Sequence, residues 1–292
     1  MVLNLLYLGR VDYSEALALQ QQLVELRHQQ RIGNTLLLLE HPPVLTLGRN
    51  SHRPNILASD AELARRGVSI HEINRGGDVT YHGPGQLVGY PIFDLRSFAP
   101  RLGVVDFVRL LEEVLIRTCA NYGLLAQRIA GRTGVWTLPA ASPAPVPEKK
   151  IAAIGVHVSR GITSHGFAFN LTPDLRDFEL IVPCGIADRA TTSLELEIDG
   201  ALLPTLEQFA NEVARQFGRV FEAQVLGLGS LQDLLATEGN LQTRPAANPM
   251  NSTGPMSSIG GATGPLNAAA ATGPESPGGV DALEEEEENL WA

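Results

Sequence analysis

The sequence predicts an α+β fold, an α/β sandwich in which helices flank mixed sheets. Two observations favour this class. Some segments carry apolar residues at helical spacing, whereas others carry the short apolar runs or the alternation typical of strands. Strands and helices also do not alternate regularly along the chain, as they would in a doubly wound parallel sheet.

Three helices are predicted. The first starts at Asp12, because an acidic cap followed by Glu15 three residues later is typical of a helix N-terminus. The second spans about 105–121 and is closed by Gly123, and the third starts near Pro204. The residues expected to face inward are Ala16, Leu19, Leu23 and Leu26 in the first helix, Phe107, Leu110, Leu111, Val114 and Thr118 in the second, and Leu206, Phe209, Val213 and Phe217 in the third.

Four segments are predicted as strands. Residues 35–40 form an apolar run that ends at His41-Pro42-Pro43, which is typical of a buried strand. The other three are 151–158, 163–171 and 193–198, the last because Leu194, Leu196 and Ile198 alternate with polar residues.

Two of these strands are expected to form a hairpin. They flank Ser159-Arg160-Gly161-Ile162, whose small and glycine residues suit a tight turn. In that register Ala153–Gly155 face Gly166–Ala168, and Lys150 lies at the open end of the hairpin. The chain leaves the same end toward Cys184.

Composition divides the chain into two parts. Of the net charge of −10 over 292 residues, −6 falls in residues 240–292, which also contain three Thr-Gly-Pro triplets and very few large apolar residues. Such a segment cannot bury enough apolar surface to offset the entropy of ordering. We therefore expect a folded domain over 1–239 and a low-complexity, acidic, disordered tail over 240–292.

The net charge, the lengths of the apolar runs and the number of cysteines exclude several classes of protein. A net negative charge argues against a nucleic-acid partner. No apolar run is long enough to cross a membrane, and the N-terminus does not resemble a signal peptide. Two cysteines are too few for a disulfide scaffold or a dedicated zinc site, and the histidines show no spacing typical of metal ligands. We expect a cytoplasmic globular protein without a metal.

Residues 75–91 are the densest unusual segment. Five glycines and two prolines surround Arg75, Asp78, Tyr81 and His82. Glycines allow backbone amides to approach a ligand closely, and an adjacent arginine supplies a charge. The segment matches neither a P-loop nor the dinucleotide-binding fingerprint. A binding loop is our preferred interpretation, and a simple turn between strands is the alternative.

A cysteine nucleophile is the second candidate feature. Cys184 lies between proline and glycine, as on an exposed turn, where a thiol with a lowered pKa can attack a carbonyl. Cys119 falls on the predicted second helix and is expected to be a small core residue. The groups that could stabilise a thiolate are Lys149, Lys150, His82 and His165. The spacing alone leaves open which of them acts.

Four motifs, in order along about 1–225, resemble the lipoyl(octanoyl) transferase family. They are the run from Arg75 to Gln86, His41-Pro42-Pro43-Val44 through Gly48-Arg49, Lys149–Val156 with His165–Ala168, and Pro183-Cys184-Gly185. Residues 138–149, rich in proline and alanine, are longer than the family pattern leads us to expect. The tail after about residue 240 has no counterpart in the family pattern.

The resemblance implies a fold similar to biotin and lipoate protein ligases and an acyl-thioester mechanism. It implies that Cys184 accepts the acyl group and that Lys150 lowers the pKa of this thiol. It also implies substrate-binding residues, which are Arg75, Gly76, Gly77, Asp78, Val79, Thr80, Tyr81, His82, Ala153, Ile154, Gly155, Gly166, Phe167 and Ala168. We expect Val79, Tyr81 and the hairpin to line a slot for the acyl chain.

The partners that the resemblance implies are octanoyl-acyl carrier protein as donor and lipoyl domains as acceptors. The acceptors include those of 2-oxoacid dehydrogenase complexes and the glycine cleavage H protein. No cofactor is expected, because a thioester is already activated and ATP is not needed. Three alternatives stay open: an ATP-dependent lipoate or biotin ligase, a non-enzymatic acyl-binding module, and a Cys–His thioesterase.

Overall fold

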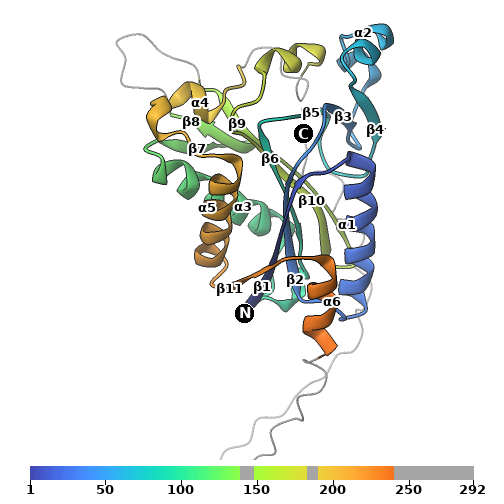
Figure 1. The fold of residues 1–292 in the computed structure, drawn as a ribbon, viewed down its shortest axis with the longest axis vertical. Coiled ribbons are helices and arrows are strands. Elements are labelled where there is room, and N and C mark those ends of the chain that lie inside the picture. Colours follow the sequence, from blue (N-terminus) through green and yellow to red (C-terminus); the bar gives the residue numbers. More distant parts are fainter. Residues whose placement is uncertain (139–147, 183–189, 240–292) are drawn as a thin grey trace, which may run out of the picture. The chain divides into compact units, whose positions relative to one another are not determined.

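A computed structural model of the protein describes residues 1–138, 148–182 and 190–239 (Figure 1). They form two sheets with helices packed around them. The larger sheet contains β1 (Val2–Arg10), β2 (Asn34–Glu40), β6 (Gln86–Ile92), β7 (Ala126–Ile129), β8 (Arg132–Thr137), β9 (Lys150–Ser159), β10 (Ile162–Asn170) and β11 (Gln224–Leu228). The smaller sheet contains β3 (Val44–Leu47), β4 (Ser69–Glu72) and β5 (Val79–His82). The helices are α1 (Tyr13–His28), α2 (Asp60–Arg65), α3 (Val104–Asn121), α4 (Leu194–Glu197), α5 (Leu206–Val220) and α6 (Leu231–Gly239).

Both sheets are mixed. The strand order of the larger one is β11-β1-β2-β6-β10-β9-β8-β7, in which β1 runs parallel to β11 and β2 and every other pair is antiparallel. Helices α3 and α5 cover one face, and α1 and α6 lie on the other (Figure 1). This arrangement confirms the predicted α+β class. Within the described ranges, no helix combines the length and apolarity needed to cross a bilayer.

The three long helices lie where the sequence predicts them. The Asp12 carboxylate caps α1 by accepting a hydrogen bond from the backbone N–H of Ser14 (2.8 Å), so the cap is confirmed. Thr205 and Gln208 form a reciprocal capping box at the start of α5. Most of the predicted inward positions are buried. The exceptions, which are only partly buried, are Leu19, Leu110 and Leu206.

The predicted buried strand and hairpin are also confirmed. Every residue of β2 is buried. In the hairpin, Gly155 pairs with Gly166 and Ala153 with Ala168, which is the expected register. The turn consists of Arg160 and Gly161, both with positive φ (+49° and +81°), as a two-residue hairpin turn requires.

The predicted strand at 193–198 is wrong. Residues Leu194–Glu197 form the short helix α4, in which Leu196 N–H donates to Ser193 O (3.2 Å) and Ile198 N–H donates to Leu194 O (3.1 Å). Leu194 is fully buried, whereas Leu196 is 67% exposed. Apolar residues four apart fit one helical turn as well as they fit a strand, and of the three apolar residues Leu194 is buried, Ile198 partly buried and Leu196 exposed.

Aromatic side chains fill the space between the larger sheet and the helices α3 and α5. The Phe93 ring lies edge-on to Phe107 and Phe217, with centroids 5.9 and 6.2 Å apart. Phe167 of β10 stacks on Phe217 of α5 at 6.1 Å. The smaller sheet has its own core, formed by Leu45, Leu47, Leu63, Val68, Val79, Tyr81, Leu180 and Ile181.

Candidate active site

The glycine-rich segment lies directly on strand β9. The backbone N–H of Gly76 donates to Val156 O (3.0 Å), and on the other side Arg49 N–H donates to Arg75 O (3.0 Å). A Cβ at Gly155 would lie 2.9 Å from Gly76 O, so only glycine allows the loop to approach this closely. A Cβ at Gly48 would overlap the carbonyl oxygen of Gly77. Residues 75–77, hereafter the glycine loop, are thus clamped between β9 and the end of β3.

Arg75 is a buried cation at the centre of this region. Its side chain is turned into the protein and the residue is only 8% exposed. The guanidinium donates to Thr46 O (2.8 Å), to Thr46 Oγ1 (2.9 Å) and to Gly76 O (3.0 Å). These bonds tie the glycine loop to β3 and hold a positive charge between the two sheets.

The hairpin β9–β10 presents two different faces. Ala153, Gly155, Gly166 and Ala168 share the face that carries the glycine loop, because paired residues of an antiparallel ladder point the same way. We call these four residues the small-residue face. Phe167 and its paired residue Ile154 lie on the opposite face, where Phe167 stacks on α5. Of the four, Gly155 lies against Arg75 and Gly76, whereas a Cβ at Gly166 would meet Gly89 O and Ala168 belongs to the hydrophobic core. Ile154 and Phe167 are separated from the glycine loop.

Strand β5 is divided in the same way. The side chains of Val79 and Tyr81 pack into the core of the smaller sheet, and the Tyr81 hydroxyl donates to Asp177 Oδ2 (2.6 Å). Burial, with this bond, raises the Tyr81 pKa well above its ordinary value. Thr80 lies on the face that carries Thr46, its partner in the ladder, and His82 lies two residues further along that face.

Between the two sheets lies a cluster of buried histidine and tyrosine rings. The His41 and Tyr13 centroids are 5.1 Å apart, and His82 stacks on Tyr13 at 6.4 Å. His41 Nδ1 contacts Val11 O (2.8 Å), which accepts only, so Nδ1 carries the proton and Nε2 accepts the Tyr90 hydroxyl (2.7 Å). Burial lowers the pKa of His41 to about 4 and that of His82 to about 3. Both rings are therefore neutral at pH 7.

His165 belongs to the same buried region. Its φ is +56°, its backbone N–H donates to Gln20 Oε1 (2.8 Å), and its Nε2 contacts Asn74 Oδ1 (2.8 Å). Burial first, and then the charge of Arg75, lower the pKa of His165 to about 3. The sequence analysis missed Tyr13, His41 and Tyr90 as members of this region. The available signal for His41 was the His-Pro turn that follows the apolar run Leu36–Leu39 and Glu40.

Lys150 is the first residue of β9 and is half-buried. Its ammonium lies 4.8 Å from the centroid of the Trp136 ring. Its backbone N–H donates to Ala190 O (3.0 Å), and its carbonyl accepts from Thr192 N–H (2.9 Å). The neighbouring Lys149 instead donates to the Glu197 carboxylate (3.0 Å). The two adjacent lysines thus lie in different environments.

The two cysteines differ in what the structure describes. Cys119 is fully buried in α3, and burial raises the pKa of its thiol to about 12, which makes it unreactive. This confirms its predicted core role. Cys184, residues 139–147 and residues 240–292 lie outside the described residues. The catalytic role of Cys184, the long loop rich in proline and alanine and the disordered tail therefore stay predictions. Among the residues that are described, no three His, Cys, Asp or Glu side chains are grouped as metal ligands.

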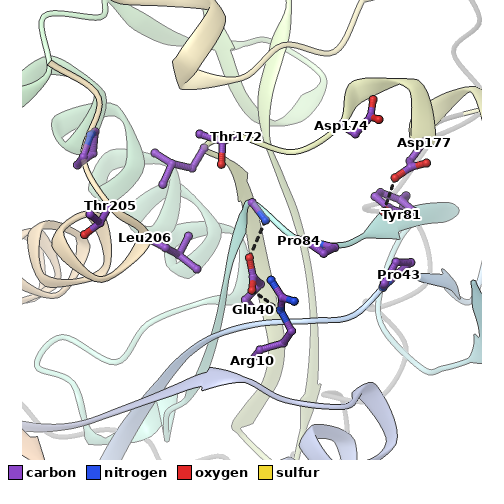
Figure 2. A pocket seen from close by; sticks show the side chains of 13 residues that line it. Arg10, Glu40, Pro43, Tyr81, Pro84, Thr172, Asp174, Asp177, Thr205 and Leu206 are labelled. Carbon is purple, nitrogen blue, oxygen red and sulfur yellow. Dashed lines mark hydrogen bonds and ion pairs between the residues drawn. The ribbon is translucent and has the colours of Figure 1, made fainter. Parts of the chain in front are cut away.

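A cavity of about 560 Å³ lies at the end of the larger sheet (Figure 2). The Glu40 carboxylate at its centre pairs with Arg10 (2.6 Å) and accepts a hydrogen bond from Gly85 N–H (2.6 Å). Thr205 and Leu206 line one side, and Asp177 and Tyr81 the other. Among those predicted site residues that the structure describes, Tyr81 alone lines this cavity. It is thus separate from the glycine loop and the small-residue face.

Comparison with known proteins identifies the family. Residues 12–218 match the lipoyl protein ligase A/B catalytic domain. The chain is 70% identical over 240 residues to an octanoyltransferase of Acidobacterium capsulatum, covering 80% of this chain and 96% of that protein. It is 54% identical over 243 residues to an octanoyltransferase of Koribacter versatilis, covering 83% of this chain and 94% of that protein.

Solved structures support the fold. A bi-partite lipoate protein ligase from Thermoplasma acidophilum superposes with a TM-score of 0.62 at 16% identity, covering 82% of this chain and 92% of that one. A lipoate-protein ligase A bound with ATP superposes with a TM-score of 0.59 at 14% identity, covering 82% of this chain and 94% of that one. The predicted ligase-like fold is thus confirmed. On the evidence of its sequence relatives, the chain belongs to the lipoyl(octanoyl) transferase family, a family of acyltransferases.

Proposed function

We propose that the protein, acting in the cytoplasm, transfers an octanoyl group from octanoyl-acyl carrier protein to the lysine of a lipoyl domain. Acceptors would be lipoyl domains of 2-oxoacid dehydrogenase complexes and the glycine cleavage H protein. The observation that carries the proposal is the contact between the glycine loop and β9. The glycine loop, which includes Arg75, lies against Gly155 of the small-residue face, and Lys150 begins β9, the strand that carries Gly155. Family membership supplies the class of reaction.

The reaction proceeds in two transfers through a thioester on Cys184. The thiolate attacks the donor's thioester carbonyl, a new carbon–sulfur bond forms, and the carrier thiolate leaves. The ε-amine of the acceptor lysine then attacks the acyl-enzyme, an amide forms, and the Cys184 thiolate leaves. In the first transfer Lys150, as an ammonium, stabilises the thiolate by charge and gives a proton to the carrier thiolate that leaves. In the second transfer the resulting neutral Lys150 amine takes up the proton that the attacking amine loses, which restores the pair of ammonium and thiolate. No ATP is consumed, because both acyl donors are activated thioesters.

The small-residue face and the glycine loop are the proposed binding surface. We assign the acyl chain to the face that carries the small side chains at 153, 155, 166 and 168, where neighbouring backbone already approaches the hairpin closely at Gly155 and Gly166. Gly76 and Gly77 bring backbone groups close to it, and Arg75 supplies a buried positive charge. Val79 and Tyr81 act by supporting β5 from the core of the smaller sheet, since their side chains pack there.

The decisive experiment is intact-mass spectrometry of the protein after mixing with octanoyl-acyl carrier protein, without ATP. We expect one octanoyl adduct in the wild type and in Cys119→Ala, and none in Cys184→Ala. Absence of an adduct in the wild type, or an adduct that persists in Cys184→Ala, contradicts the mechanism. An adduct that forms but never passes to a lipoyl domain would favour a thioesterase, whereas an acyl-binding module would give no covalent adduct with any donor.

A second candidate is an ATP-dependent ligase, favoured by the superposition on the lipoate-protein ligase A that was solved with ATP. Such an enzyme needs no cysteine nucleophile. It would acylate a lipoyl domain from free octanoate and ATP, and Cys184→Ala would retain that activity. The same pair of proteins therefore decides between the two candidates.

We assign the activity to residues 1–239. The family match ends at residue 218, well before the acidic tail. A chain that ends at residue 239 should transfer octanoyl groups at the wild-type rate. A large loss of turnover in that chain would show that the tail takes part.

A further inference from the structure

A series of buried hydrogen bonds, made by the side chains of His82, Gln86 and Asn170, leads from the smaller sheet toward Lys150. His82 Nδ1 contacts Gln86 Oε1 (3.2 Å), Gln86 Nε2 donates to Asn170 Oδ1 (3.0 Å), and Asn170 Nδ2 donates to Thr192 O (2.9 Å). Gln86, Asn170 and Thr192 are 1%, 4% and 1% exposed. Each link fixes the next, because the Asn170 oxygen is occupied as an acceptor and its nitrogen must therefore face Thr192.

Thr192, the last residue of this series, is hydrogen-bonded to the backbone of Lys150. Thr192 N–H donates to Lys150 O (2.9 Å), and Lys150 N–H donates to Ala190 O (3.0 Å). Lys150 also forms a parallel bridge with Thr191. The paired register of β9 with β10 extends only to Ala152, so Lys150 projects beyond that ladder. Beyond the end of the β10 ladder, the backbone of Lys150 is therefore held by the segment 190–192.

Asn170 lies at the point where the segment 190–192 meets the proposed site. It is the last residue of β10 and pairs with Gln86 of β6. By alternation it lies on the same face as Gly166 and Ala168, at the end of that face nearest to Lys150. Its carboxamide therefore links the small-residue face to the segment that carries Lys150.

We infer that Asn170 is a positioning residue, whose carboxamide holds segment 190–192 in place and thereby sets the position of the Lys150 ammonium. This inference rests on the proposed function, which assigns Lys150 the task of stabilising the Cys184 thiolate. A purely structural asparagine would contribute to stability alone. A positioning asparagine also sets the distance between the Lys150 ammonium and the Cys184 thiol, and thereby the pKa of that thiol.

The test measures the rate of Cys184 alkylation against pH in a Cys119→Ala background. Cys184 is then the one thiol in the chain, so the measured rate belongs to it alone. We expect Lys150→Met to raise the midpoint of this profile by about one pH unit or more, because an opposite charge within a few ångströms lowers a pKa by about that amount. Asn170→Ala should raise the midpoint in the same direction. The double variant should add nothing to the shift of Lys150→Met, because both changes act through one ammonium.

Asn34→Ala is the matched control. Asn34 is also 4% exposed and makes several hydrogen bonds, including one that it accepts from Asp94 N–H (2.9 Å), but it begins β2 and does not contact Lys150. It should lower the urea midpoint of unfolding comparably and leave the alkylation midpoint unchanged. If Asn170→Ala does not fold, Asn170→Asp takes its place. It keeps the shape and the bond from Gln86, but as a carboxylate it cannot donate to Thr192 O.

The outcomes separate the two claims. A folded Asn170 variant with a wild-type midpoint, beside a shifted Lys150→Met, overturns the positioning role and leaves the proposed function intact. An unshifted Lys150→Met overturns the role of the lysine and the inference together. A shift in Asn34→Ala equal to that in Asn170→Ala would show that lost stability, and not position, moves the midpoint, and would also overturn the inference.

Discussion

Replacing Gly155 by alanine tests whether the contact between the glycine loop and β9 shapes the acyl site. A Cβ at this position would lie 2.9 Å from Gly76 O and 3.3 Å from Arg75 Cδ. Ordinary contacts of a Cβ begin at 3.4 Å, so the Gly76 carbonyl must retreat by about half an ångström. The adjacent hydrogen bond from Gly76 N–H to Val156 O (3.0 Å) resists that movement.

The change should affect activity more than stability. Overpacking costs about 1–3 kcal/mol, while the loss of glycine's freedom in the unfolded chain returns about 0.4–1 kcal/mol. The net loss of unfolding free energy is therefore about 0–2.6 kcal/mol. A misplacement of about 1 Å can lower a rate about 100-fold, so a shift of half that size predicts about a 10-fold lower kcat/KM for octanoyl transfer.

The assay follows transfer from octanoyl-acyl carrier protein to a lipoyl domain at several donor concentrations, beside urea unfolding of the same samples. Gly227→Ala is the control, because a Cβ there, in the edge strand β11, would meet nothing within 4 Å. It should leave kcat/KM unchanged and change the unfolding free energy by no more than the gain of about 0.4–1 kcal/mol expected from the unfolded chain. If folded Gly155→Ala keeps kcat/KM within about twofold of wild type, the loop is not positioned by this contact.

Three further predictions concern stability. Because burial holds the pKa of His41 near 4 and those of His82 and His165 near 3, the unfolded chain binds more protons below about pH 6.5. Unfolding free energy should then fall with decreasing pH, by at most about 4 kcal/mol per pH unit for three histidines, and a flat series of urea midpoints from pH 7 to pH 5 would contradict this. Phe217→Ala should cost about 3–5 kcal/mol in urea unfolding, because the ring is fully buried among other phenylalanines, and Phe217→Leu clearly less. Thr205→Ala should cost about 1 kcal/mol by removing the α5 cap, and Thr205→Ser should retain the cap and the stability.

The parts of the fold that the sequence predicts well are those whose cause is local. The hairpin follows from a two-residue turn at Arg160-Gly161 and from small residues that alternate on either side of it. The helix starting at Asp12 follows from a capping side chain and a periodic apolar stripe. In each case a few neighbouring residues decide the backbone conformation, and tertiary packing agrees with them.

The parts predicted poorly depend on which side of an element has a core to face. Residues 193–198 alternate as a strand does, yet Leu194 is buried and Leu196 is exposed, so one helical turn forms in place of a strand. Val79 and Tyr81 lie in the most unusual segment of the sequence, but alternation along β5 turns them into the core of the smaller sheet. The sequence motif shows that this strand matters and does not show which of its faces is the functional one.

The candidate site shows the same limit at longer range. Arg75 and Gly155 are 80 positions apart in the sequence, and glycine at 155 becomes meaningful only once the glycine loop lies on it. Asn170 likewise resembles any polar residue at a strand end until Thr192 is seen to accept its hydrogen bond and to hold Lys150. A motif identifies the groups that carry out the chemistry, since their type is constrained by the reaction. The residues that aim those groups are constrained by geometry alone, and only the folded chain reveals them.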